Sequence, residues 1–225
     1  MITKNGALVF TFTAKTDIWT GDANGKANSL KHTGLLGSIR WWFEVIVRGL
    51  GGYACDPLDT QCQEKNHCVV CELFGCTGWG RKFRFDVLGE NDEHIQEQIL
   101  KDKTFKLKFT PLRPIEEAER ALLSLTLKLI SRYKAIGGKA IPKSYRKDFG
   151  LIELIQEEPH YFEKKAAGDL KKELRRHIVA SQFRKNNNKK LWNSLNNLKL
   201  EEHAWSKNNT TNVIDEILDN LRNSP

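Results

Sequence analysis

The order of its periodic segments is the feature that most limits how this chain can fold. Apolar and polar residues alternate in three segments, as in strands with one buried face, at residues 7–14, 82–88 and 104–109. A helical stripe begins near Thr33, and a second begins after Pro114. A short apolar segment at 150–155 completes the series. The order β-α-β-β-α-β predicts an α+β fold of the ferredoxin-like type, with an antiparallel four-stranded sheet and two helices on one face.

Each predicted helix carries one apolar stripe with the spacing of a core-facing helix. In the first the stripe is Leu35, Ile39, Trp42 and Ile46. In the second it is Ile115, Ala118, Leu122, Leu125 and Leu129. Glycine pairs at 51–52 and 137–138 follow the two helices and end them.

These segments divide the chain of 225 residues into a ferredoxin-like domain at 1–156, with a cysteine-rich insertion at about 51–80, and a helical C-terminal extension at 157–225. The net charge is +8, and residues 160–199 alone hold 11 Lys or Arg against 3 Asp or Glu. A neutral body with a basic segment suggests a polyanionic partner, nucleic acid or an acidic protein surface, although a solvated Lys-rich helix has the same composition.

The N-terminal segment and the cysteines bear on the cellular compartment. No apolar run approaches the ~18 residues of a membrane-spanning helix, and residues 1–12 lack the basic and apolar regions of a signal peptide. Five cysteines are an odd number for a disulfide framework. We therefore expect a cytoplasmic protein without a membrane partner.

All five cysteines fall between residues 55 and 76. Cys68 and Cys71 form a CxxC pair, and with Cys55 and Cys62 as the second pair they predict a structural zinc site. Cys76, flanked by aromatic residues, is expected to be a small buried residue instead. Unliganded thiols, or redox activity of the CxxC pair, are the alternatives. The absence of a surrounding thioredoxin-like βαβ unit argues against the redox role.

Basic and aromatic residues interleave at 40–43 and at 79–85. In the second segment Phe83 and Phe85 are expected to face the helices, with Lys82 and Arg84 on the open face of the sheet, where RNA-recognition domains bind bases. Trp41 lies off the first helix's apolar stripe and is available to stack on a base or on a neighbouring subunit; a partly exposed structural Trp is the alternative.

Several motifs resemble the family of first subunits of the type III-B CRISPR Cmr effector complexes, members of the RAMP superfamily. They are Trp19-Thr20-Gly21-Asp22, the segments 33–44 and 47–52, and Cys68 to Trp79. Gly37-Ser38-Ile39-Arg40 is similar to the superfamily's Gly-Ser-x-(Lys/Arg) signature, and 136–139 with 149–152 is similar to its glycine-rich loop and final strand. The resemblance covers about residues 8–90 and, more loosely, 136–155. Most members of this family carry a second ferredoxin-like half, where this chain has residues 157–225.

The resemblance implies an RRM-like domain that acts as a non-catalytic RNA-binding subunit. Its partners would be crRNA, target RNA at the end distal to the crRNA 5′ tag, and the other RAMP subunits of the Cmr complex. Asp22 lies in the loop where the slicing subunits carry their aspartate but lacks their surrounding motif, so the resemblance transfers no catalysis to it. The residues expected to contact RNA are Lys31, Arg40, Trp41, Arg48, Arg81, Lys82, Arg84, Lys139, Lys143 and Arg146.

Two other functions fit the same residues. The first is a RAMP-type, metal-independent endoribonuclease that processes crRNA, with His32 as general base and a lysine as charge stabiliser. The second is a protein-interaction adaptor without RNA contact. No Ser/His/Asp set, HExxH motif or paired-carboxylate site stands out in the sequence.

Overall fold

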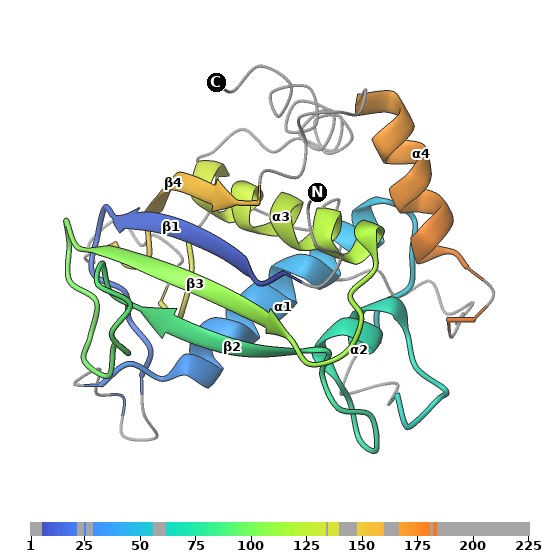
Figure 1. Cartoon of the computed structure of the whole chain (residues 1–225), viewed down its shortest axis with the longest axis horizontal. Coiled ribbons are helices and arrows are strands. Elements are labelled where there is room, and N and C mark those ends of the chain that lie inside the picture. The colour runs from blue at the N-terminus through green and yellow to red at the C-terminus, as the bar shows by residue number, and fades with distance from the viewer. Residues whose placement is uncertain are drawn as a thin grey trace. The chain divides into compact units, whose positions relative to one another are not determined.

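The computed structural model describes residues 6–21, 25, 29–55, 62–133, 135–139, 148–159, 167–180 and 182–183 (Figure 1). The elements in chain order are β1 (Leu8–Ala14), α1 (His32–Gly49), α2 (Val69–Phe74), β2 (Phe83–Leu88), β3 (Thr104–Pro111), α3 (Glu117–Tyr133), β4 (Ile152–Glu158) and α4 (Ala167–Ile178). No helix in these ranges is both long and apolar enough to span a bilayer.

The four strands form one antiparallel sheet in the order β2-β3-β1-β4 (Figure 1). The central pair is in continuous register, with Phe12 opposite Phe105 and Phe10 opposite Leu107. Strands 2 and 3 follow each other in the chain and are paired, whereas β1 lies between β3 and β4. This is the ferredoxin-like topology predicted from the sequence.

One face of the sheet is buried because the apolar residues of the central strands β1 and β3 recur at every second position. Burial alternates along β1 and along β3. The core on this face is rich in phenylalanine: the rings of Phe12 and Phe105 stack with centroids 5.6 Å apart, and Phe83 meets Phe109 edge-on at 5.1 Å. Such aromatic pairs contribute about 0.5–1.5 kcal/mol beyond the area that they bury.

Helices α1 and α3 form where the periodicity predicts them. Every residue of both predicted stripes is buried. Helix α3 has Glu117 and Glu119 in its first turn and Arg132 in its last, the charge distribution that complements the helix dipole. Strand β4 begins two residues later than expected, after a bridge between Ala135 and Leu151.

Two elements lie in regions that the periodicity describes poorly. Helix α2 occupies part of the cysteine-rich insertion, where the sequence pattern predicts no helix, because six residues are too few to show a helical period. Helix α4 is part of the predicted helical extension. The rest of the predicted helical extension, residues 160–166, 181 and 184–225, lies outside the described residues.

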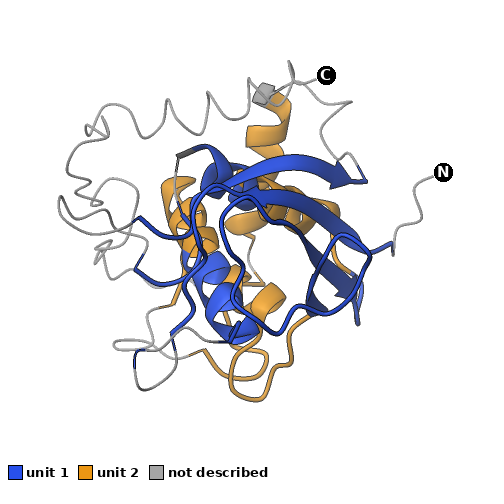
Figure 2. Ribbon diagram, turned by 90° about the vertical axis from the view of Figure 1, so that its left-hand side faces the viewer, with its two compact units in different colours: residues 1–41, 83–114, 126–160 blue, residues 42–82, 115–125, 161–225 orange. Residues whose placement is uncertain are grey.

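The chain divides into two compact units that interleave along the sequence (Figure 2). Unit 1 comprises residues 1–41, 83–114 and 126–160 and contains the sheet. Unit 2 comprises residues 42–82, 115–125 and 161–225 and contains the cysteine-rich insertion with α2 and α4. The sequence boundary expected between residues 156 and 157 stays a prediction.

Candidate nucleic-acid interface and metal centre

Three of the sequence motifs meet in unit 1 around Trp19. The amide of Gly138 donates to the carbonyl of Trp19 at 2.8 Å. The amide of Gly137 donates to Oγ of Ser38 at 3.1 Å. The Trp-Thr-Gly segment, the Gly-Ser motif of α1 and the glycine-rich loop therefore form one cluster, although they lie far apart in the chain.

Two of the predicted RNA-contacting lysines belong to this cluster. Lys139 Nζ lies 4.2 Å from the ring centroid of Trp19, within cation–π distance. Lys31 is exposed, and its backbone amide donates to Oγ1 of Thr20 at 2.8 Å. The cluster thus presents two cationic side chains and one aromatic ring, the groups that bind phosphates and stack on bases.

We expect Gly137→Ala to destabilise unit 1. The φ angle of Gly137 is 89°, and an added Cβ would lie 2.6 Å from the Trp19 carbonyl oxygen. A strained non-glycine residue of this kind costs about 1–3 kcal/mol. Chemical denaturation measures the loss. Gly37→Ala is the matched control: Gly37 lies in α1, and an added Cβ meets nothing within 4 Å beyond its chain neighbours and the backbone of its own helix, so the variant should gain about 0.5–1 kcal/mol. Equal stability of Gly137→Ala and wild type would contradict the packing described.

The remaining predicted RNA contacts differ in exposure. Arg81 and Arg84 are exposed, and Arg84 Nε donates to Asp86 at 2.9 Å. Arg40 and Trp41 are half-buried on α1. Lys143 and Arg146 lie outside the described residues.

Arg48 and Lys82 do not present their charge to solvent, contrary to the expectation for RNA contacts. Arg48 is 7% exposed, and its Nη2 donates to the carbonyls of Ala54 at 3.0 Å and Cys55 at 3.2 Å. Lys82 is 6% exposed and lies just before β2, so the alternation of that strand does not apply to it. Both side chains are committed to partners inside unit 2.

The open face of the sheet offers no platform for base stacking. The outward positions of the two central strands, β1 and β3, hold Val9, threonines and lysines, with Thr11 opposite Lys106 and Val9 opposite Lys108. Every phenylalanine of the strands is on the buried side. Lys106 also pairs with Asp92 at 2.8 Å. The aromatic stacking used by RNA-recognition domains therefore has no side chain on the described strands of this face.

The predicted cysteine quartet is brought together in unit 2. The Sγ atoms of Cys55, Cys62, Cys68 and Cys71 all lie within 4.8 Å of one another, and all four residues are buried. Cys55 Sγ and Cys71 Sγ are 3.5 Å apart, and the amide of Cys68 donates to Cys62 Sγ at 3.2 Å. Cys76 is only half-buried and stands apart from the quartet, so the expectation of full burial is not met.

This quartet fits a tetrahedral metal site. Four sulfurs at the usual Zn–S length of about 2.3 Å lie about 3.8 Å from one another, which is compatible with the observed spacing. The four residues are free cysteines rather than disulfides.

Hydrogen bonds with the Cys55 thiol lower the pKa of Cys62 to about 7 and hold the pKa of Cys68 well below its usual range. Interactions with other members of the quartet raise the pKa values of Cys55 and Cys71. Thiolate character within the cluster is what metal binding requires.

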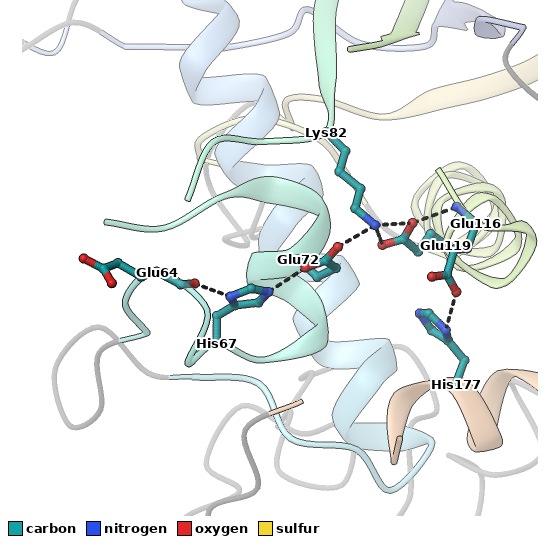
Figure 3. A network of polar contacts seen from close by, with 7 residues as sticks. All are labelled: Glu64, His67, Glu72, Lys82, Glu116, Glu119 and His177. Atoms are coloured by element: carbon teal, nitrogen blue, oxygen red, sulfur yellow. Dashed lines mark hydrogen bonds and ion pairs between the residues drawn. The ribbon is translucent and has the colours of Figure 1, made fainter. Parts of the chain in front are cut away.

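A chain of polar contacts borders the cysteine quartet (Figure 3). His67 Nε2 contacts Glu72 Oε2 at 2.5 Å, and its Nδ1 donates to the carbonyl of Glu64. Glu72 Oε1 pairs with Lys82 Nζ at 2.6 Å. Lys82 Nζ also contacts both carboxylate oxygens of Glu119, at 2.9 and 3.0 Å. These contacts connect the segment that carries Cys68 and Cys71 to the first turn of α3.

The pKa values of this network follow from burial and pairing. Burial raises the pKa of Glu119, and its pairing with Lys82 only partly offsets this. For Lys82 burial acts to lower the pKa, but hydrogen bonds to Glu72 and Glu119 raise it overall. For Glu72 burial acts to raise the pKa, yet Lys82 and His67 lower it overall. In the sequence, the one sign of this network is Glu119. It directly follows a residue of the buried α3 stripe, and a charged side chain that is buried needs a partner of opposite charge.

His32, the candidate general base, lies at the start of α1. Its Nε2 contacts the carbonyl of Ile95 at 2.8 Å and therefore donates the proton. Asp17 Oδ1 accepts a hydrogen bond from the amide of Lys101 at 2.9 Å. Asp22 lies outside the described residues.

Comparisons with known proteins place the chain in a family. The RAMP superfamily model matches residues 11–141. Among solved structures, Cmr1 from Pyrococcus furiosus in its apo form is 12% identical with a TM-score of 0.49, over 72% of this chain and 53% of that chain. A chain of the Csm3–Csm4 subcomplex of the type III-A CRISPR-Cas interference complex is 18% identical with a TM-score of 0.38, over 67% and 75%. The chain thus spans about half the length of the Cmr1 chain, and no curated protein gives a significant match.

The matched segment runs from the first strand through α1, the cysteine-rich insertion, the β2–β3 pair and α3 to the glycine-rich loop. It therefore includes the Trp19 cluster and the cysteine quartet. Because it covers more than half of the chain, the protein belongs to the RAMP superfamily.

Proposed function

We propose that this protein is a non-catalytic RNA-binding subunit of a type III-B CRISPR Cmr ribonucleoprotein. In this role it contacts crRNA and target RNA at the end distal to the crRNA 5′ tag, and it docks on other RAMP subunits in antiviral defence. Membership of the RAMP superfamily and the likeness of its motifs to the Cmr first subunits support the assignment. A role in such a complex implies a cytoplasmic protein.

The observation that carries this proposal is the cluster at Trp19. It joins an aromatic ring to Lys139 and brings together the Gly-Ser motif of α1 and the glycine-rich loop. The exposed Lys139 beside the Trp19 ring, and the exposed Lys31 of the same cluster, supply phosphate contacts, and the ring supplies stacking, without a defined base code. The proposed RNA contacts are those predicted from the sequence without Arg48 and Lys82, which are buried. They are Lys31, Arg40, Trp41, Arg81, Arg84, Lys139, Lys143 and Arg146.

We expect the double variant Lys31→Gln and Lys139→Gln to bind single-stranded RNA more weakly and with a weaker salt dependence. Each phosphate contact that is lost should lower the salt slope by about 0.7 log units, so the two together lower it by about 1.4. Fluorescence anisotropy over a series of salt concentrations measures this. The control is Lys101→Gln with Lys103→Gln, which removes two exposed charges from the loop before β3. Equal effects of both pairs would contradict a specific site.

The same incubations report on catalysis. In a non-catalytic subunit the RNA, including CRISPR repeat RNA, stays intact with and without divalent metal. Metal-independent cleavage by the wild type that is lost in His32→Ala would replace the proposal with the endoribonuclease function. Assembly into the complex without any RNA contact would favour the adaptor function.

We also propose that the cysteine quartet holds a structural zinc ion. Four buried thiols whose Sγ atoms all lie within 4.8 Å of one another, in an insertion with a single six-residue helix among its described residues, support this role. The ion would cross-link residues 55–71 and so stabilise a segment that has little core of its own.

A further inference from the structure

Helix α4 is fixed to unit 2 by one face. Leu170, Leu174 and Ile178 recur at intervals of four residues and are all at most 3% exposed. The fit is close at the last of them, because a Cβ added at Gly52 would lie 3.2 Å from Cβ of Ile178. The helix is therefore held by its apolar stripe rather than lying free in solvent.

A polar contact at the end of α4 continues the network that borders the cysteine quartet (Figure 3). His177 Nδ1 lies 3.4 Å from a carboxylate oxygen of Glu116. The amide of Glu116 in turn donates to Glu119, which pairs with Lys82. Burial lowers the pKa of His177. Within unit 2, contacts thus run from the cysteine-bearing segment to α4.

The opposite face of α4 is cationic and exposed. Lys172, Arg175 and Arg176 are all exposed, and at about 100° per residue they lie on one side of the helix, away from the buried stripe. None of the three has an ion pair within the described part of the chain. Two acidic residues flank this face: Asp169 lies three residues before Lys172, and the half-buried Glu173 lies three residues before Arg176. The face therefore carries a net positive charge that the helix itself does not neutralise.

The exposed cations of α4 repel one another and destabilise the helix when no anion is bound. Lys172 and Arg176 are four residues apart, and like charges at this spacing destabilise a helix by about 0.2–0.5 kcal/mol. An anion placed between them removes the repulsion. Phosphate is well suited, since Arg binds phosphate oxygens bidentately and two of the three side chains are Arg.

Because the apolar stripe of α4 is buried, a membrane surface is not a suitable partner for this helix. A basic amphipathic helix that binds a membrane surface inserts its apolar face into the bilayer. Here that face is covered by unit 2 and is not available. What α4 offers to a partner is a set of exposed cations, which suits a phosphate backbone.

We propose that Lys172, Arg175 and Arg176 form a second RNA-binding surface, on α4, that contacts the phosphate backbone independently of base sequence. The inference rests on the proposed RNA-binding function and adds to it a site in the region after the ferredoxin-like domain. It also gives the C-terminal extension a role in RNA affinity.

The test is the full-length triple variant Lys172→Gln, Arg175→Gln and Arg176→Gln. The loss of three phosphate contacts should lower the salt slope for single-stranded RNA by about 2 log units per log unit of salt, equally for different RNA sequences. Gln is about as good a helix former as Lys or Arg, so circular dichroism should be unchanged. The control removes three exposed charges elsewhere, with Lys65→Gln, Lys101→Gln and Lys103→Gln.

The outcomes separate this inference from the proposed function. Suppose that the wild type binds RNA. If the triple variant then keeps the wild-type salt slope, or if the control variant loses as much of its salt slope as the triple variant, the α4 surface is overturned, while RNA binding by the protein stands. If wild type binds no RNA, the proposed function falls and the α4 surface with it. Competition by polyglutamate that matches competition by RNA would assign the surface to an acidic protein instead.

Discussion

Replacing Cys71 by serine should abolish metal binding and unfold the cysteine-rich part of unit 2. Cys71 is buried in α2 with its Sγ 3.5 Å from that of Cys55. A structural zinc site contributes on the order of 10 kcal/mol to folding, which is comparable to the whole stability of a typical domain. Elemental analysis measures the zinc content, and hydrogen exchange over residues 62–82 measures the unfolding. Treatment of the wild type with a strong chelator should reproduce the result.

Cys76→Ser is the matched control, because Cys76 lies five residues further on but outside the quartet. It should retain one zinc per chain and the protection of the wild type. Wild-type protein prepared without chelator that carries less than half an equivalent of zinc would contradict the metal site. Loss of zinc from Cys76→Ser as well as from Cys71→Ser would mean that the ligand set is different.

Lys82→Met should destabilise unit 2 strongly without weakening RNA binding. The substitution leaves Glu119, whose side chain is 0% exposed, facing Glu72 with no cation between them. Removing one partner of a buried ion pair costs about 3–5 kcal/mol. Urea denaturation measures the stability, and anisotropy under native conditions measures the RNA affinity.

Two further variants keep this prediction testable if Lys82→Met folds poorly. Adding Glu119→Gln removes one of the stranded charges and should recover part of the loss. Lys15→Met breaks an ion pair with Glu153 in which both side chains are more than half exposed, and it should cost less than about 1 kcal/mol. A loss of RNA affinity in Lys82→Met at unchanged stability would restore Lys82 to the RNA-contacting set.

The fold follows from local patterns in the sequence to a large extent. Strand β1 and helix α1 were predicted because their apolar residues recur with periods of two and of three to four. The period of the apolar residues indicates which side of a strand or helix is buried, irrespective of the segment that covers that side. The grouping of Cys55, Cys62, Cys68 and Cys71 was also predicted, since short spacing along the chain limits how far apart the thiols can lie.

The roles of individual basic residues could not be predicted from the sequence in the same way. In the sequence, nothing distinguishes Lys82 from Arg81 and Arg84, since all three are basic residues of one segment that also holds aromatic residues, and Arg48 is a basic residue in the last turn of a predicted helix. In the structure Arg48 binds the carbonyls of Ala54 and Cys55. A basic residue can be buried only where other segments supply its partners, and the sequence does not say which segments those are.

By itself, then, the sequence determined the ferredoxin-like order of elements, the cysteine quartet and the basic character of the C-terminal segment. The tertiary structure alone decided that Lys82 lies between Glu72 and Glu119, 10 and 37 residues away in the chain, while Lys31 and Lys139 stay exposed. The physical reason is that periodicity is a local property of the chain, whereas the burial of a charge depends on counter-charges that only folding brings within hydrogen-bonding distance.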